Sequence, residues 1–161
     1  MSVALEDMSA YARSVVERLG LEAHPEGGWY TRDWQSPHED ATSKRPLASL
    51  IYFLLPEGDA SAWHKVDADE LWLWHGPAPV TLELGGNGDS PQEDAGKRTQ
   101  ITLGSGIVTD DASAGDAAGS PITGHAVVPA GIWQRTLPGT ADALVSCVVS
   151  PGFVFEGFTL E

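Results

Sequence analysis

The sequence predicts an all-β protein, a sandwich or barrel of antiparallel strands with one N-terminal α-helix. Short segments rich in β-branched and aromatic residues follow one another from residue 24 to residue 149, and most are divided by Gly, Pro or Asp. A run of short strands of this kind is typical of a sandwich or barrel. Helical periodicity occurs only before residue 20, so no helices alternate with the strands as a parallel βαβ sheet requires.

The helix is predicted within residues 3–19. Its apolar residues recur every three or four positions, at Val3, Leu5, Met8, Tyr11, Ala12, Val15, Val16 and Leu19. Gly20 stands where a C-cap glycine belongs, and Asp7 or Ser9 would begin the helix. We therefore expect one amphipathic helix.

The strands are predicted in nine segments: residues 24–35, 47–55, 61–66, 69–75, 80–84, 98–103, 125–129, 132–137 and 143–149. Residues 85–96 and 109–124 consist mainly of Gly, Ala, Ser, Asp and Pro, and they bury too little apolar surface to offset their ordering entropy. We expect both to be surface loops. No repeat or composition break marks a second domain, so residues 1–161 are predicted as one domain, with the helix in 1–20 and the strands in 24–161.

Composition and charge limit the partners and the compartment. The 161 residues carry a net charge of −14, which argues against nucleic acid and anionic membranes as partners. Cys147 is the single cysteine, so no internal disulfide forms, and its apolar surroundings predict a buried, inert thiol. We see no signal peptide and no apolar stretch long enough to span a membrane. These features predict a soluble, cytoplasmic protein.

Residues 61–76 (SAWHKVDADELWLWHG) carry the chemistry-bearing side chains. A carboxylate within an aromatic strand is expensive to bury unless it is paired, so Glu70 and His64 are predicted to pair in a Trp-walled pocket. Strand alternation places Trp72 and Trp74 on the Glu70 face and His75 on the other. The alternative is a purely structural His–Glu pair, with the tryptophans in the core.

The spacing of these residues resembles the two cupin motifs. Gly58, His64 and Glu70 match the first motif, in which Val66 replaces the second His, while Gln134 replaces the His of the second motif. Valine offers no lone pair and an amide is a poor ligand for a transition metal. We therefore expect no required cofactor and no tight metal, and a weakly held divalent ion at His64, Glu70 and Gln134 is the alternative.

Longer stretches resemble the cupin family known as Cupin_5 or DUF985. They are residues 24–34 (HPEGGWYTRDW), 49–84, 128–134 and 144–160, in the family's order. The resemblance implies a jelly-roll barrel (a double-stranded β-helix), a homodimer, and similarity to sugar-nucleotide 3,5-epimerases. It also makes Glu26 and Phe153 candidates for the pocket.

The leading hypothesis is an isomerase or epimerase acting on a small, sugar-like metabolite. His64 would remove a proton next to a carbonyl, and Glu70 would orient the imidazole. Tyr52 or Tyr30 would return a proton on the opposite face. The full predicted substrate site comprises Glu26, Tyr30, Tyr52, Trp72, Trp74, His75, Gln134 and Phe153. The alternatives are a non-catalytic module that binds a ligand between tryptophans, and a metal-dependent dioxygenase or hydrolase.

Overall fold

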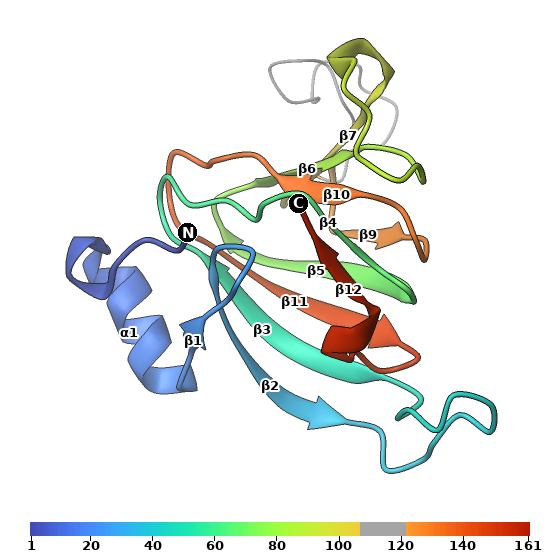
Figure 1. Cartoon of the computed structure of the whole chain (residues 1–161). Helices are drawn as coiled ribbons and strands as arrows, with labels where there is room; N and C mark the ends of the chain where they lie inside the picture. The colour runs from blue at the N-terminus through green and yellow to red at the C-terminus, as the bar shows by residue number, and fades with distance from the viewer. Residues whose placement is uncertain (107–121) are drawn as a thin grey trace.

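The structure, a computed structural model, describes residues 1–106 and 122–161 and consists of two β-sheets with one α-helix packed on the outer face of the first (Figure 1). The first sheet has the order β1 (Glu22–Ala23), β2 (Trp29–Gln35), β3 (Ser49–Leu55), β11 (Ala143–Ser150), β5 (Asp69–Pro77) and β9 (His125–Val128). The second has the order β12 (Phe158–Leu160), β4 (His64–Val66), β10 (Gln134–Thr136), β6 (Val80–Leu84), β7 (Thr99–Leu103) and β8 (Ile122–Thr123). The predicted all-β fold is confirmed.

The strand pairs are antiparallel except for β7 and β8, which pair in parallel. Each predicted strand segment contains a strand, although the strands are mostly shorter than the segments. β8 falls within residues 109–124, which the sequence predicted as a loop. The rest of that prediction, residues 109–121, lies outside the described residues. The other predicted loop, residues 85–96, contains no strand; the short 3-10 helix η2 (Ala95–Lys97) begins at its end.

The helix α1 (Ala10–Leu19) lies against the outer face of the first sheet. Ser9 is its N-cap and accepts a hydrogen bond from the backbone N–H of Ala12 (3.0 Å). Gly20 ends it in the left-handed conformation (φ 66°), as the sequence predicted. A separate 3-10 turn, η1 (Leu5–Asp7), precedes it. The buried side chains of this layer are Met8, Ala12, Val16, Leu21 and Leu54.

The main core lies between the two sheets, where alternate side chains of each strand point inward. It is formed by Phe53, Leu55, Trp72, Val80, Leu82, Leu103, Ala126, Val128, Ala143, Val145 and Cys147. Phe53 and Cys147 also line a cavity that continues from this core. Among the described residues, no helix is long and apolar enough to cross a membrane.

Candidate active site

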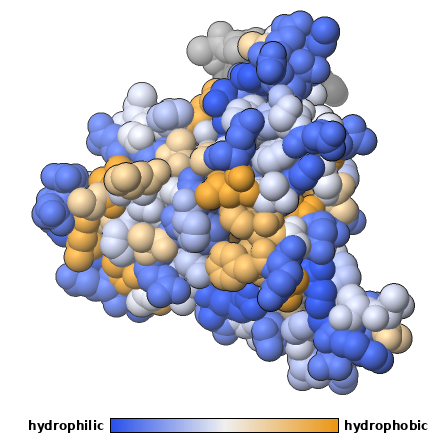
Figure 2. Space-filling view, viewed as in Figure 1, coloured by the Kyte–Doolittle hydropathy of each residue, from blue (hydrophilic) through white to orange (hydrophobic). Residues whose placement is uncertain are grey.

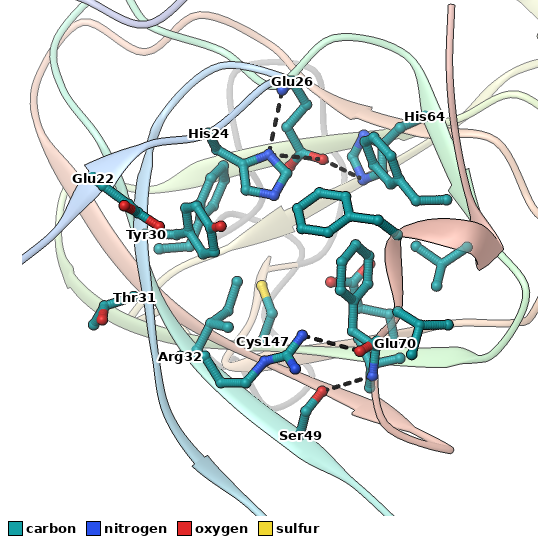
Figure 3. Close-up of a pocket in the computed structure, with 18 of the residues that line it drawn as sticks. Glu22, His24, Glu26, Tyr30, Thr31, Arg32, Ser49, His64, Glu70 and Cys147 are labelled. Atoms are coloured by element: carbon teal, nitrogen blue, oxygen red, sulfur yellow. Dashed lines mark hydrogen bonds and ion pairs between the residues drawn. The ribbon is translucent and has the colours of Figure 1, made fainter. Parts of the chain in front are cut away.

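A cavity of about 580 Å³ opens between the two sheets (Figure 3). Strands of both sheets form its walls, and the segment 153–158, which contains the 3-10 helix η3 (Phe155–Gly157), adds three phenylalanines. Its aromatic lining is Tyr30, Phe53, Phe153, Phe155 and Phe158. Figure 2 shows apolar surface gathered over β12 and η3, where Phe155 remains 52% exposed. The cavity therefore combines aromatic side chains with titratable and other polar groups.

A tight turn brings His24 and Glu26 into the cavity. The turn closes through two backbone hydrogen bonds, from Gly27 N–H to the His24 carbonyl (3.1 Å) and from His24 N–H to the Gly28 carbonyl (2.9 Å). Gly27 and Gly28 adopt positive φ angles of 109° and 72°, which glycine tolerates best. This turn is the reason that the predicted strand 24–35 begins only at Trp29. Both side chains of the turn are buried.

Glu26 lies between two imidazoles. Its Oε2 is 3.6 Å from His24 Nδ1 and 3.4 Å from His64 Nε2 (Figure 3). His64 Nδ1 is 2.8 Å from the Ala62 carbonyl, which only accepts, so Nδ1 carries the proton and Nε2 of the neutral ring has a lone pair. The backbone N–H of Glu26 donates to His24 Nδ1 (3.3 Å), so that nitrogen also has a lone pair. Two acceptors thus face Glu26, and a protonated carboxyl is able to donate to one of them.

The electrostatics of the three groups agree with this assignment. Burial raises the pKa of Glu26 well above its usual value, and the nearby Glu70 raises it further. Burial lowers the pKa of His64 to about 4. The pKa of His24 is also lowered to about 4, by burial and then by the proximity of His64. These shifts favour the uncharged form of all three side chains.

Glu70, on β5, is the second carboxyl of the cavity. Its Oε2 accepts a hydrogen bond of 2.6 Å from Gln134 Nε2, and Gln134 Oε1 accepts one of 2.9 Å from Trp72 Nε1. Burial raises the pKa of Glu70 to about 7, although hydrogen bonds from Gln134 and Cys147 lower it in part. The Cys147 thiol is buried as predicted and lies in the cavity wall, where burial and Glu70 raise its pKa. Glu70 is therefore the group that changes charge near neutral pH.

The structure contradicts the predicted pairing of His64 with Glu70. The carboxyl beside His64 is that of Glu26, and the partner of Glu70 is Gln134. The prediction assumed that a turn after Val66 returns the chain beside β4. Instead the chain crosses there from one sheet to the other, so β4 and β5 are not neighbours. His64 and Glu70 line the same cavity from different sheets.

Five of the predicted site residues line the cavity: Glu26, Tyr30, His64, Glu70 and Phe153. Gln134 lies behind Glu70 and holds it. Burial raises the pKa of Tyr30, and its hydrogen bond with Glu22 raises it further.

Four predicted residues do not line the cavity. Trp72 shares the Glu70 face, as predicted, but is 1% exposed in the core, and Trp74 donates to the Ala78 carbonyl (2.7 Å). Tyr52 points away because its neighbours Ile51 and Phe53 face inward. His75 also lies on the outer face, where its Nε2 is 2.6 Å from Ser146 Oγ. These positions contradict their predicted contact with a ligand in this cavity.

Sequence reasoning missed His24, Arg32 and the place of Cys147 in the cavity wall. His24 stands two residues before Glu26 in the stretch HPEGG, and a second imidazole so close to a candidate carboxylate was the available signal. Arg32 alternates with Tyr30 along β2, so the same inward face would have indicated it.

Two sheets of short, mainly antiparallel strands around a polar cavity define a double-stranded β-helix, the fold of the cupin superfamily. Residues 13–161 match the family described as "Cupin superfamily (DUF985)". The chain therefore belongs to the DUF985 family. None of the curated proteins matches its sequence.

Solved structures support this assignment. A protein from Shewanella oneidensis is 32% identical, with a TM-score of 0.74 over 93% of this chain and 84% of that one. A hypothetical protein from Leishmania major is 26% identical, with a TM-score of 0.72 over 93% and 86% of the two chains. A variant of oxalate decarboxylase from B. subtilis is 11% identical, with a TM-score of 0.55 over 99% of this chain and 32% of that one, a similarity of fold alone.

Many cupins hold a divalent metal, but the residues of this cavity do not fit one. Gln134 turns its amide N–H toward Glu70, and its carbonyl oxygen is taken by Trp72. Val66 offers no ligand atom. Within residues 1–106 and 122–161, no three His, Cys, Asp or Glu side chains are grouped so that they could hold a metal ion.

Proposed function

We propose that this protein isomerises or epimerises a small polar, sugar-like metabolite by proton transfer, with His64 as the base. One observation carries the proposal: the Glu26 carboxyl lies 3.4 Å from the unprotonated Nε2 of His64, and both side chains are buried in the cavity wall. Adjacent acid and base groups whose pKa values are displaced by burial are typical of proton-transfer sites. Glu26 replaces Glu70 as the partner of His64 in this proposal.

The proton-transfer step forms no net charge. His64 Nε2 takes the proton from the carbon next to a substrate carbonyl, while Glu26 gives its proton to the carbonyl oxygen. The substrate becomes a neutral enol, and the two side chains become an imidazolium–carboxylate pair. The two opposite charges of this pair attract each other strongly, because both side chains are buried and their closest atoms are 3.4 Å apart.

Glu70 lies on the other sheet and supplies a second proton-transfer group. Its pKa of about 7 leaves it partly protonated at neutral pH, so it is able to give or take a proton. Delivery of a proton from this side to the enol carbon would invert the stereocentre. Tyr30 also lines the cavity, whereas Tyr52 points away from it.

The proposal is tested by incubation with 4-keto sugars and with α-acidic carbonyl compounds in deuterated water. Wild-type protein should incorporate deuterium at the carbon next to the carbonyl, detected by proton NMR, and chelator treatment should leave the rate unchanged. His64→Asn and Glu26→Gln should each slow incorporation by about 10²–10⁴-fold, the usual contribution of a positioned proton-transfer group.

His125→Asn is the matched control, because His125 is exposed on β9 away from the cavity. Its rate should equal that of the wild type. If the folded wild-type protein binds these compounds without any exchange, the protein is a binding module and the catalytic proposal is wrong. If His64→Asn retains the full rate, His64 is not the base.

A further inference from the structure

Arg32 supplies the only Lys or Arg side chain in the cavity lining of the described residues. Its NH2 group donates to the Phe153 carbonyl (3.0 Å), and its guanidinium lies 5.8 Å from the centre of the Phe153 ring. These contacts leave its remaining N–H groups without a carboxylate partner among residues 1–106 and 122–161. Arg32 is an exposed residue whose guanidinium is positioned by Phe153, and it has N–H donors to offer to a ligand.

The cavity separates Arg32 from the Glu26–His64 pair. In Figure 3, His24, Glu26 and His64 gather on one side, whereas Arg32 and Ser49 lie on the opposite side. Apolar side chains occupy the remaining wall, including Ile51, Phe53 and Val149. The His64 side is uncharged and suits a carbonyl or hydroxyl group, and the Arg32 side is cationic.

We infer that the ligand is a small monocarboxylate in which part of the carbon chain separates the carboxylate from a carbonyl or hydroxyl group. The carboxylate pairs with Arg32, and the uncharged oxygen lies beside Glu26 and His64. A guanidinium and a carboxylate match as planar, two-point partners. This inference rests on the proposed function for the role of His64, but the anion subsite depends only on Arg32 and its surroundings.

The other carboxyls of the cavity limit the ligand to a single negative charge. Glu22 and Glu156 also line the cavity, and the chain as a whole carries a net charge of −14. Tyr30 engages Glu22 through a hydrogen bond, and no ion pair joins Glu22 to Arg32 among the described residues. One arginine among these carboxyls would hold one carboxylate but would not offset the repulsion of a phosphate dianion or a nucleotide diphosphate.

Three matched probes test the inference by titration calorimetry: 4-oxo-4-phenylbutanoate, its uncharged amide, and the phosphonate dianion of the same chain length. The wild type should bind the carboxylate about fivefold or more tighter than the amide, the order expected for a two-point ion pair that stays partly in water. It should bind the phosphonate more weakly than the carboxylate. Arg32→Gln should abolish the preference for the carboxylate and leave affinity for the amide unchanged, whereas Arg18→Gln, on the exposed face of α1, should behave as the wild type.

Equal wild-type affinity for the carboxylate and the amide, or binding of neither, would overturn the inference without recourse to any variant. Tighter binding of the phosphonate would also overturn it. Deuterium exchange is measured separately on the same probes. A preference for the carboxylate without deuterium exchange would support the Arg32 subsite and refute the catalytic proposal. Equal exchange of carboxylate and amide, by both the wild type and Arg32→Gln, would support the catalytic proposal and refute the Arg32 subsite.

Discussion

At the scale of single residues, four buried titratable side chains share one cavity: His24, Glu26, His64 and Glu70. In the native protein burial favours protonated carboxyls and unprotonated imidazoles, because it shifts each pKa toward the neutral form. In the unfolded chain, carboxyls titrate near 4.5 and imidazoles near 6.5. Between these values the carboxyls and the imidazoles therefore have opposite effects on the pH dependence of the free energy of unfolding.

Removal of one of these four groups should change the pH dependence of the free energy of unfolding. The pKa of Glu70 is raised on folding, so its contribution is present below 4.5 and is lost as the pH rises toward 7. Glu70→Gln removes that loss, and the free energy of unfolding should rise with pH, relative to the wild type, by about 1.4 kcal/mol per pH unit between 4.5 and 6.5.

Removal of His64 should change the pH dependence of the free energy of unfolding in the opposite direction. Its pKa is lowered to about 4 on folding, so its contribution is lost as the pH falls below 6.5. Relative to the wild type, the free energy of unfolding of His64→Asn should therefore fall with rising pH by a similar amount per pH unit. Urea denaturation of the three proteins across this window measures both slopes. Parallel profiles for all three would show that the groups are not buried in these protonation states.

At the scale of elements, the turn His24–Gly28 holds two of the four groups in place. A Cβ on Gly27 would collide with the carbonyl oxygen of Ala60, which belongs to the segment that leads into β4. The Glu26 carbonyl accepts a hydrogen bond of 2.7 Å from the Ala62 N–H of the same segment. The turn and the chain before His64 thus pack backbone against backbone.

Gly27→Ala should lower the free energy of unfolding by roughly 3 kcal/mol or more, because the clash adds to the strain of a positive φ. Gly58→Ala is the control, since Gly58 has a similar positive φ (77°) but open space around a new Cβ. It should cost only about 1–2 kcal/mol. Equal losses in chemical denaturation would mean that the turn is free to move away from Ala60.

The sequence predicts most of the helix and strand positions, but not which strands are neighbours. Period-2 alternation and Gly20 predict the strands and the end of α1 because these signals are local. Alternation also tells which side chains share a face, as it does for Glu70 and Trp72. It does not tell which sheet a strand joins, so the crossing between β4 and β5 was missed, and with it the true partner of His64. Glu26 was found through a family resemblance and not through its chemistry.

At the scale of the whole molecule, we predict a homodimer. β3 is an inner strand and α1 covers its outer face, so the expectation that strand 49–55 has an uncovered edge is wrong. The prediction of a dimer therefore rests on the family resemblance. Sedimentation at micromolar concentration should give about twice the chain mass of 17.1 kDa, and a monomer mass would refute it.

The way β4 is held has a consequence for how long a ligand stays. β4 has one paired position with β10 and three with β12, whereas β11 has seven with β3 and eight with β5. The wall that carries His64 is therefore fastened more weakly than the wall that carries Glu70, and it opens at a lower free energy than the whole fold. A ligand that contacts both walls would then loosen first on the His64 side. Its residence time would depend on the local opening of β4 and β12 as well as on the strength of its own contacts.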